Sequence, residues 1–377
     1  MKKALLITLD FPPVRGGVAA YWAGLGSGLS ADEFAVLTLP AFGSETFDKE
    51  QSYYISRKKL LARYIWPHWL PLFWQVWKTL KKTGAEKILV GQILPIGTVA
   101  YIFKKLFGMS YIVSLHGLDF QLTKQSARKR RLANLILQSA ESIVVNSEAT
   151  KKLVLAEKAD WEKKITVVYP CPKICPEPCD ELMAESLREK YALQGKKVIL
   201  SVGRLVERKG FDQVIRASAE VKKSLPEAKT IILGSGPDRE RLTALIAELG
   251  LENDVLLLAP ESDRQIAGFY SLCSLFAMPS RELPNGDVEG FGIVFLEANA
   301  FGRPVIGGRS GGVAEAVAEG VSGLLVDPLS VQELTDTILM LLKDEGLAGR
   351  LGENGRKRVL ERFGWGEQAG RVKNVLG

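Results

Sequence analysis

The sequence predicts an α/β protein built from two doubly wound parallel sheets, and three observations support this fold class. The chain has 377 residues, which exceeds one ordinary hydrophobic core and fits two domains. Short apolar runs recur along both halves and alternate with longer segments whose apolar residues are spaced by three or four. Strands that are apolar throughout are typical of sheets buried on both faces, and helices between them make the crossovers that parallel strands need.

The expected strands and helices alternate along the chain. The strands are ALLITL, KILVGQI, YIVSLHG, ESIVVNS and ITVVYP in the first half, and KVILSVGR, TIILGSG, DVLLLA, SLFAMPS and RPVIGG in the second. The helices include VAAYWAGLGSGL, ATKKLVLAEK, LMAESLREKYAL, FDQVIRASAEVKKSL and RERLTALIAELG. The Pro- and Cys-rich stretch from Pro170 to Asp180 separates the halves, so we expect domains at 1–180 and 181–360. Residues 361–377 form a final helix that either covers the second sheet or crosses back to the first domain.

Composition narrows the class of protein further. Fifty Lys and Arg residues against 43 Asp and Glu leave a net charge of +7, which suits anionic ligands or an anionic membrane surface without indicating nucleic acid as a partner. The N-terminal apolar run ends at Asp10, too soon for a signal peptide, and no run reaches the ~20 residues of a membrane span. We therefore expect a cytoplasmic protein.

Three of the four cysteines, Cys171, Cys175 and Cys179, lie together in CPKICPEPC. Their spacing lacks the C-x-x-C pair of zinc sites, and the two histidines, His68 and His116, are distant in sequence. Reduced thiols in a loop are therefore favoured over a metal site. We expect no metal ion and no cofactor.

Two segments carry groups suited to an anionic ligand. Gly16 and Gly17 precede a helix, so their amides can approach an anion, although a plain tight turn is the alternative. Arg204 ends a strand and Lys209 lies five residues later, which places both at the carboxyl edge of the second sheet. An Arg fork and a Lys charge at this edge suit a diphosphate, whereas solvated surface cations are the alternative. Arg208 is expected to be solvated.

The most specific segment of the chain is RELPNGDVEGFGIVFLEANAFGRPVIGG, where Glu289 precedes a Gly-Phe-Gly turn and Glu297 lies eight residues later. If both were helical, they would be about 12 Å apart, too far for the acid and base of a glycosidase. A carboxylate accepts hydrogen bonds from paired hydroxyls, so one glutamate can hold a hexose and the other a ribose, with a diphosphate between them. The alternatives are that Glu289 caps the helix and that Glu297 covers its surface.

Taken in order, GRLVERKG, LGSGP, PSRE followed by VEGFGIVFLEA, and SGGVAEAV resemble the retaining glycosyltransferases of family 4. The resemblance runs from FPPVRGG through SLHGLDF and VVNSEAT to GLLVDP and covers most of the chain. It implies the GT-B fold, in which two Rossmann-like domains face an interdomain cleft, the N-terminal one binding the acceptor and the C-terminal one the donor. It departs at VVYPCPKICPEP, where the family usually has Pro or Asn followed by Gly-Val-Asp, and this leaves the conformation of the hinge open.

The resemblance also implies roles for individual residues. Arg204 and Lys209 would bind the donor diphosphate, Glu297 the ribose and Glu289 the transferred sugar. His116 in SLHGLDF would lie beside that sugar, although the residues alone also allow a buried core histidine. The residues expected to take part in catalysis are Glu289, His116, Arg204 and Lys209. The residues that would add further contacts to the donor are Gly16, Gly17, Gly234, Gly290, Phe291, Gly292 and Ile293.

Donor and acceptor follow from the resemblance less directly. The form DVEGFGIV, with RELPNG before it, is similar to bacterial mannosyltransferases that use GDP-mannose and lipid acceptors, and close variants occur in enzymes that use UDP-sugars. We expect transfer of a hexose, mannose from GDP-mannose ahead of glucose or N-acetylglucosamine from UDP, to a lipid-linked or glycan acceptor in the synthesis of cell-envelope polysaccharide or glycolipid. Transfer would be retaining and independent of metal, because cations and helix amides can neutralise the leaving diphosphate and the sequence has no D-x-D cluster.

Other classes of protein stay open beside this enzyme. They are a nucleotide-sugar-binding protein without activity, and a GT-B epimerase or phosphorylase. The intact set of Glu289, Glu297, Arg204 and Lys209 counts against the first, and no convincing segment for the pyridoxal phosphate of a phosphorylase is found.

The stretch 57–82 sets four tryptophans between flanking cations: Trp66, Trp69, Trp74 and Trp77. This combination is typical of a segment at a membrane interface. RKRR at 128–131 adds a second basic cluster. Docking on anionic lipid and packing of the tryptophans in the N-terminal core are the two interpretations.

Overall fold

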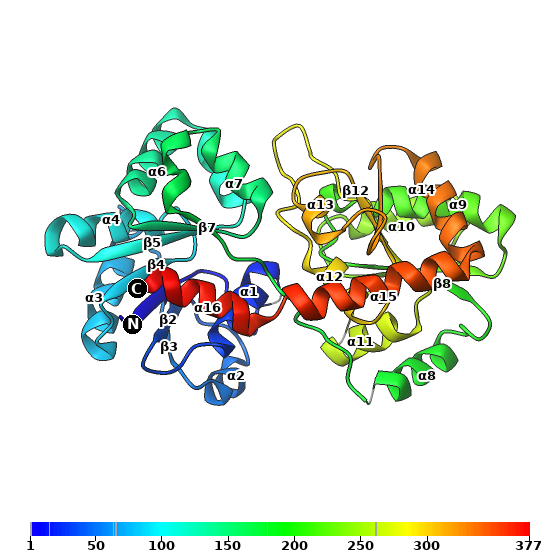
Figure 1. Cartoon of the computed structure of the whole chain (residues 1–377), viewed down its shortest axis with the longest axis horizontal. Helices are drawn as coiled ribbons and strands as arrows, with labels where there is room; N and C mark the ends of the chain where they lie inside the picture. Colours follow the sequence, from blue (N-terminus) through cyan, green and yellow to red (C-terminus); the bar gives the residue numbers. More distant parts are fainter. Residues whose placement is uncertain (1, 15, 63, 65, 179, 261) are drawn as a thin grey trace. The chain divides into compact units, whose positions relative to one another are not determined.

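The computed structural model describes residues 2–14, 16–62, 64, 66–178, 180–260 and 262–377, which divide into two compact units (Figure 1). Unit 1 comprises Met1–Cys171 with Trp365–Gly377, and unit 2 comprises Pro172–Gly364. Each unit contains one sheet, and every paired strand in it runs parallel to its neighbours. The predicted fold class, α/β with two doubly wound parallel sheets, is confirmed.

The sheet of unit 1 has seven strands in the order β3-β2-β1-β4-β5-β6-β7. Their bounds are β1 Ala4–Ile7, β2 Phe34–Thr38, β3 Tyr54–Arg57, β4 Lys87–Val90, β5 Ser110–Leu115, β6 Ser142–Val145 and β7 Ile165–Val167. The strand order reverses between β1 and β4. At this switch point the Gln92 side chain accepts a hydrogen bond from the Leu9 amide (2.9 Å), so one polar contact joins the loops after the two strands.

Helices cover both faces of this sheet. They are α1 Gly17–Ser27, α2 Ser44–Glu50, α3 Leu70–Thr83, α4 Ile96–Phe107, α5 Leu118–Lys124, α6 Ala127–Ser139, α7 Glu148–Leu155, the short 3-10 helix η1 Ala159–Lys164 and α16 Trp365–Leu376. One apolar core holds α3, α4 and α6 against the sheet, and a second core holds α1 and α16 against the opposite face.

The last helix, α16, packs against α1 within unit 1 (Figure 1). A Cβ on Gly24 of α1 would lie 2.1 Å from the Trp365 ring, and a Cβ on Gly28 would lie 2.5 Å from the Cβ of Ala369. The glycines of GLGSGL therefore allow two helices to approach closely. Of the two positions expected for the C-terminal helix, the structure shows the one against the first sheet.

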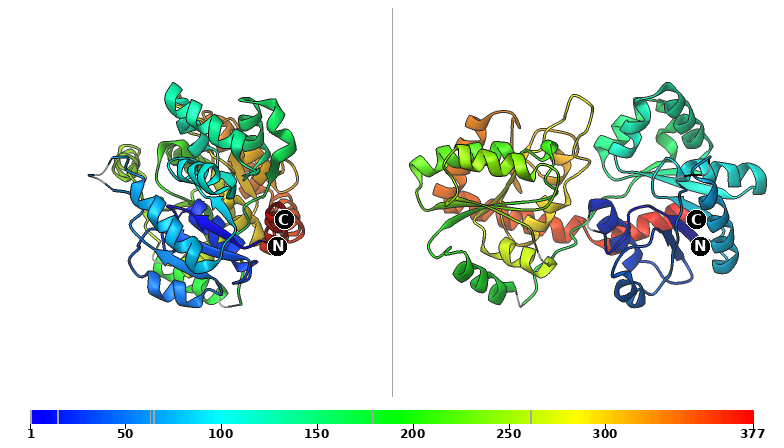
Figure 2. Two further views of the ribbon diagram at one scale, coloured as in Figure 1. Left: turned by 90° about the vertical axis from the view of Figure 1, so that its left-hand side faces the viewer. Right: turned by 180° about the vertical axis from the view of Figure 1, so that it is seen from behind.

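The sheet of unit 2 has six strands in the order β10-β9-β8-β11-β12-β13. Their bounds are β8 Lys197–Val202, β9 Ala228–Leu233, β10 Val255–Leu258, β11 Leu275–Met278, β12 Val305–Gly308 and β13 Gly323–Val326. The helices are α8 Asp180–Lys190, the 3-10 turn η2 Glu207–Lys209, α9 Phe211–Ser224, α10 Arg239–Glu248, α11 Asp263–Leu272, α12 Ile293–Ala300, α13 Val313–Ala316, α14 Val331–Lys343 and α15 Glu345–Arg362. Seen from behind, this sheet lies between helix layers (Figure 2), with α9 flanked by α10 and α14 on one side.

The boundary between the units lies at Cys171–Pro172 in the sequence, so the expected boundary at 180–181 is corrected. The reason is a pair of hydrogen bonds, because the amides of Lys173 and Ile174 donate to Glu297 of α12 at 3.3 Å each. These bonds fasten the start of the expected linker to unit 2. At the other end, unit 2 extends to Gly364 instead of residue 360, because α15 continues to Arg362.

Three strands are absent from the sequence prediction: β2, β3 and β13. The edge strands β3 and β13 have only four residues each, so neither gives a long periodic signal. By contrast β2, FAVLT, is buried throughout and has the apolar run of a central strand, so the sequence does contain its signal.

The contact between α1 and α16 gives a stability prediction. Gly24→Ala should lower the free energy of unfolding by about 1–3 kcal/mol, because the added methyl group forces the Trp365 ring out of its place. Gly370→Ala on α16 is the matched control, since a Cβ there meets no atom within 4 Å and Ala favours a helix by about 1 kcal/mol. Urea unfolding followed by circular dichroism measures both, and equal midpoints for the two variants would contradict the packing.

Candidate functional site

Two loops of unit 2 meet where the order of its sheet reverses, between β8 and β11. The loop after β8 contains η2 and leads into α9, and the loop after β11 leads into α12. Ligands of doubly wound sheets bind beyond the carboxyl ends of the strands at such a switch point. These loops therefore define the candidate site, and they carry Lys209 and Glu289 respectively.

The structure joins Lys209 and Glu289 in a buried ion pair. The Lys209 Nζ lies 2.5 Å from the Glu289 Oε2, and each residue is only 8% exposed. Burial alone would raise the pKa of Glu289, but the positive charges of Lys209 and Arg208 outweigh burial and hold that pKa below its usual value. An ammonium group and an ionised carboxylate therefore stand side by side at the switch point.

A second set of ion pairs supports the two loops. The Arg281 guanidinium lies 3.1 Å from Asp212 of α9, and the Arg281 amide donates to the carbonyl of Arg208 (2.8 Å). Arg208 in turn lies 3.5 Å from Asp287, and its side chain is 21% exposed. The expectation that Arg208 is solvated is therefore wrong, because it pairs with the loop after β11. Sequence reasoning also missed Arg281, whose role depends on a carboxylate 69 residues away.

The start of α12 has the backbone form that the glycines predict. Gly292 is the N-cap residue and has a φ of 95°, a conformation that favours glycine, and α12 begins at Ile293. Phe291 is buried, and its ring centroid lies 6.0 Å from that of Phe363. A Cβ on Gly312 would lie 2.2 Å from the Gly290 carbonyl oxygen, so the loop of residues 310–312 packs closely against this turn.

Arg204 and Gly234 lie at the same edge of the sheet. Arg204 is exposed two residues beyond β8, and its side chain has no ion pair among the residues that the structure describes. A Cβ on Gly234, just after β9, would lie 2.0 Å from the carbonyl oxygen of Gly203. Close packing of the two loops thus requires a glycine at 234, independently of any contact with a donor.

Glu297 is held by three hydrogen bonds inside unit 2. Its Oε1 accepts from the amides of Lys173 and Ile174, and its Oε2 accepts from the Tyr270 hydroxyl (3.1 Å). The residue is 6% exposed, and burial raises its pKa. Glu297 therefore does not cover the surface of α12. The Glu289 carboxylate, for which a helix cap is the alternative, forms its ion pair with Lys209.

In unit 1, His116 lies just beyond β5 among aromatic rings. Its ring centroid is 5.1 Å from that of Tyr21 and 5.8 Å from that of Trp22. Burial lowers the pKa of His116 to about 4, so the imidazole is neutral at physiological pH. Its amide donates to Asp119 (2.9 Å), which fixes the loop that carries it.

Gly16 and Gly17 are exposed where α1 begins. A Cβ on Gly16 would meet no atom within 4 Å, so contacts among the described residues do not require glycine there. The neighbouring Arg15 lies outside the described residues.

The cysteines divide between the units. Cys171 is buried in unit 1 and Cys175 is exposed in unit 2, whereas Cys179 lies outside the described residues. Within the described ranges, no three His, Cys, Asp or Glu side chains are placed to hold a metal ion together.

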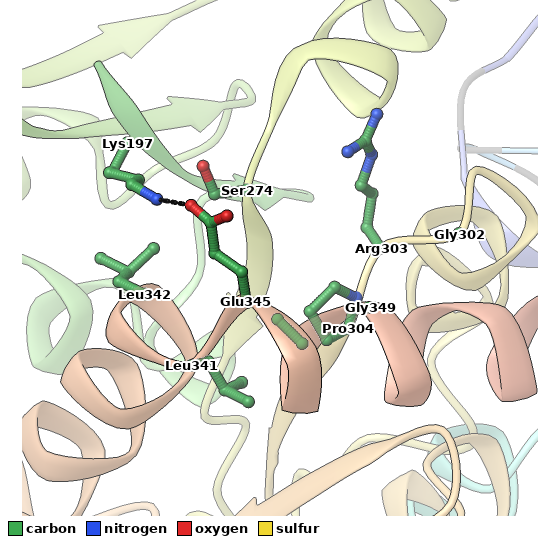
Figure 3. Close-up of a pocket in the computed structure, with 10 residues that line it drawn as sticks. Lys197, Ser274, Gly302, Arg303, Pro304, Leu341, Leu342, Glu345 and Gly349 are labelled. Carbon is green, nitrogen blue, oxygen red and sulfur yellow. Dashed lines mark hydrogen bonds and ion pairs between the residues drawn. The ribbon is translucent and has the colours of Figure 1, made fainter. Parts of the chain in front are cut away.

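A pocket of about 190 Å³ lies at the opposite, amino edge of the second sheet (Figure 3). Lys197 at the start of β8 bridges it through an ion pair with Glu345 (2.5 Å). The pocket is smaller than the roughly 300 Å³ of ordinary ligand sites, and none of the expected site residues lines it. It is therefore separate from the candidate site.

Solved structures of other proteins share this fold. Anabaena HepE in complex with UDP and glucose has a TM-score of 0.82 and 22% identity, covering 100% of this chain and 99% of its own. Sucrose-phosphate synthase from Thermosynechococcus elongatus has the same TM-score and identity and covers 100% and 98%. With two Rossmann-like units, the chain has the GT-B fold of glycosyltransferases.

The family follows from the sequence itself. Residues 15–171 match the description "Glycosyltransferase Family 4", and residues 183–358 match "Glycosyl transferases group 1". The chain belongs to the family 4 glycosyltransferases, as its motifs predict. A curated relative from Mycolicibacterium smegmatis, the GDP-mannose-dependent alpha-(1-6)-phosphatidylinositol monomannoside mannosyltransferase, is 29% identical and aligns over 99% of this chain and 97% of its own length. A relative from Corynebacterium glutamicum that acts on the monoacylated form is 26% identical and aligns over 100% and 98%.

The buried ion pair of the site gives a prediction that a double-mutant cycle can measure. Lys209→Met should lower the free energy of unfolding by about 3–5 kcal/mol at pH 7.5, because it leaves the Glu289 carboxylate buried without its nearest cation. The low pKa of Glu289 stabilises the wild type above the unfolded value of about 4.3, and this stabilisation is lost as the pH falls. The difference in unfolding free energy between the wild type and Lys209→Met should therefore shrink toward pH 4.5, where the unpaired Glu289 carboxyl group takes up a proton.

Glu289→Gln and the double variant complete the cycle. Because each single variant strands a buried polar group, the double variant should be less destabilised than the sum of the two. Urea unfolding at both pH values measures all four proteins. Additive effects at pH 7.5 would show that the pair does not interact in solution.

Proposed function

We propose that this glycosyltransferase moves a hexose from a nucleotide sugar to a lipid-linked or glycan acceptor, with retention of configuration and without a metal ion. The observation that carries the proposal is the Lys209–Glu289 pair at the switch point of the second sheet. An ammonium group suits a phosphate, and an ionised carboxylate only accepts hydrogen bonds, which suits sugar hydroxyls. A ligand that satisfies both groups 2.5 Å apart carries a phosphate next to a polyol, as a sugar diphosphate does.

Binding of such a donor exchanges one set of partners for another. The phosphate replaces Glu289 as the partner of Lys209, and sugar hydroxyls replace Lys209 as the partners of Glu289. Arg204, exposed at the same edge, adds a second cation for the diphosphate. Negative charge grows on the departing diphosphate during transfer, so these fixed charges stabilise the transition state more than the ground state.

Retention is proposed without a covalent intermediate. The acceptor hydroxyl attacks on the face that the diphosphate leaves, and a phosphate oxygen takes its proton. Neutral His116 fits a positioning role beside the transferred sugar, because an imidazole with a pKa of about 4 donates one hydrogen bond and adds no positive charge. Glu289, Lys209 and Arg204 then bind and orient, and none of them serves as the nucleophile.

GDP-mannose is the proposed donor. The mycobacterial and corynebacterial relatives that align over nearly the whole chain are named for GDP-mannose, and their acceptors are phosphatidylinositol mannosides. UDP-glucose or UDP-N-acetylglucosamine is the second candidate, since HepE, at 22% identity, binds UDP. We propose a glycolipid or cell-envelope polysaccharide as the product.

Nucleotide binding and transfer test this function together. GDP and GDP-mannose should raise the melting temperature more than UDP, ADP or their sugars, because a ligand that binds only the folded state stabilises it. Glu289→Ala and Lys209→Ala should abolish transfer of radiolabelled mannose to a bacterial lipid extract. Glu282→Ala, an exposed carboxylate in the same loop, is the matched control and should keep wild-type turnover.

The outcomes separate the alternatives. If only UDP or its sugars raise the melting temperature, the donor is a UDP-sugar in place of GDP-mannose, and the class of enzyme stays the same. A nucleotide shift without transfer to any lipid or glycan favours a binding protein, and release of an epimerised nucleotide sugar favours an epimerase. Wild-type turnover in Glu289→Ala contradicts the site.

We propose further that unit 1 docks on an anionic membrane at the inner face of the cytoplasmic membrane. Trp66 is 81% exposed and Trp74 is 56% exposed, whereas Trp69 and Trp77 are half-buried and pack against the core. Each earlier interpretation thus fits part of the segment. Among the described residues, no helix is long and apolar enough to cross a bilayer.

The exposed apolar surface continues from α3 onto α4, which the sequence pattern did not indicate. Leu106 and Phe107 at the end of α4 are 64% and 47% exposed, and Phe107 contacts Trp77 of α3 at a centroid distance of 4.7 Å. The left view of Figure 2 faces this side of unit 1. Exposed lysines flank the apolar side chains: Lys78, Lys81, Lys82 and Lys105. Aromatic rings rimmed by lysines suit the headgroup region of an anionic bilayer.

Vesicle binding tests this surface. The wild type should sediment with vesicles that contain 30% phosphatidylglycerol and bind much less to pure phosphatidylcholine. Trp66→Ser with Trp74→Ser should weaken binding about tenfold, because two rings no longer enter the interface. Leu182→Ser with Leu360→Ser is the matched control, since these side chains of unit 2 are 74% and 72% exposed. Equal loss in both double variants, or equal binding to both lipids, would contradict the proposal.

A further inference from the structure

The carboxylate expected to bind the donor ribose already has protein partners. Glu297 receives three hydrogen bonds, two from the amides of Lys173 and Ile174 and one from the Tyr270 hydroxyl. An ionised carboxylate offers about four acceptor positions, so one remains. Glu297 is also only 6% exposed. A ribose diol, which presents two hydroxyl donors, cannot bind this carboxylate while the linker amides stay in place.

The linker segment itself is held by contacts that are easy to exchange. The hydrogen bonds from its two backbone amides to the Glu297 Oε1 have donor–acceptor distances of 3.3 Å, at the weak end of the hydrogen-bond range. The Lys173 ammonium lies 2.6 Å from Asp263, but both side chains are nearly half exposed, so the pair adds little. Ile174 contributes one buried apolar side chain. By contrast, Tyr270 of α11 is buried, and its hydroxyl would keep its hydrogen bond to Glu297 when the linker segment leaves.

The segment 172–174 lies where the chain passes from unit 1 to unit 2. Pro172 is the first residue of unit 2, directly after the last residue of the first part of unit 1. The peptide that covers Glu297 therefore belongs to one of the two places where the chain passes between the units, the other being Gly364–Trp365. Displacing it changes the backbone of the connection itself, and hinge residues of this kind couple a ligand site to domain movement.

We propose that residues 172–174 form a displaceable cover of the ribose subsite, so that a donor nucleotide binds Glu297 only as the cover leaves. This inference rests on the proposed function, because it takes Glu297 as the ribose ligand. Ribose hydroxyls replace the Lys173 and Ile174 amides on Oε1, and the freed linker adopts another path. The alternative role of Glu297 is a permanent anchor for the linker, in which case nucleotide binding leaves these amides bonded.

Amide hydrogen exchange with and without GDP distinguishes the two roles. Exchange at Lys173 and Ile174 should become several-fold faster when GDP saturates the wild-type chain, while the loops after β8 and β11 become slower. Acceleration on binding is diagnostic, because a ligand that merely rests on a preformed site slows exchange around it. Unchanged or slower exchange at these two amides, in protein that GDP stabilises against heat, would overturn the cover and leave the proposed function standing. The absence of thermal stabilisation by any nucleotide would overturn the proposed function and this inference together.

A variant that loosens the cover gives a second, independent measurement. Asp263→Asn removes the ion pair of Lys173 without touching Glu297, so the cover leaves more easily and GDP should bind about threefold more tightly by calorimetry. Glu185→Gln is the matched control, because it breaks a comparably exposed ion pair, with Arg188 on α8, that does not involve the linker. The control should leave the Kd for GDP unchanged. An unchanged or weaker affinity in Asp263→Asn would contradict a cover that competes with the nucleotide.

Discussion

The ion pair between Lys209 and Glu289 is the interaction around which the candidate site is arranged. Two opposite charges, each 8% exposed, are stable there because each neutralises the other in a region that water barely reaches. The pair Arg208–Asp287 ties the loop after β8 to the loop after β11, and the pair Arg281–Asp212 ties the loop after β11 to α9. The positive and negative charges of this site neutralise one another, so the proposed anionic donor would enter by exchanging partners with them.

Glycine makes this arrangement sterically feasible. Gly234 and Gly312 each bring backbone to within about 2 Å of where a side chain would begin, which lets adjacent loops close on one another at the edge of the sheet. Gly292 turns the chain into α12 with a φ that other residues rarely adopt. The same principle acts in unit 1, where Gly24 and Gly28 let α16 lie against α1. Open positions such as Gly16 differ, because contacts among the described residues do not demand a glycine there.

The two carboxylates that the motif sets eight residues apart have different surroundings. Glu289 lies beside cations that lower its pKa, whereas burial raises the pKa of Glu297, which holds neutral donors from the linker and Tyr270. Glu289 therefore suits a ligand group that can replace Lys209 as its partner. Glu297 suits a neutral group that donates hydrogen bonds, such as a hydroxyl or an amide. This contrast supports the proposal of a sugar at the first and a ribose at the second, in which the linker would compete with the nucleotide for Glu297.

The sequence by itself determined the fold class, the family and the segments that meet at the carboxyl edge of the second sheet. Periodicity and motif spacing are local properties, and the strands of a parallel sheet bring their loops together whatever the details of packing. Only the tertiary structure decided the pairing of Arg281 with Asp212, the pairing of Arg208 with Asp287 and the contact of Lys173 and Ile174 with Glu297. It also decided which tryptophans of 57–82 are exposed and that Leu106 and Phe107 extend their surface. These features depend on contacts between residues far apart in the sequence, and no local pattern encodes such contacts.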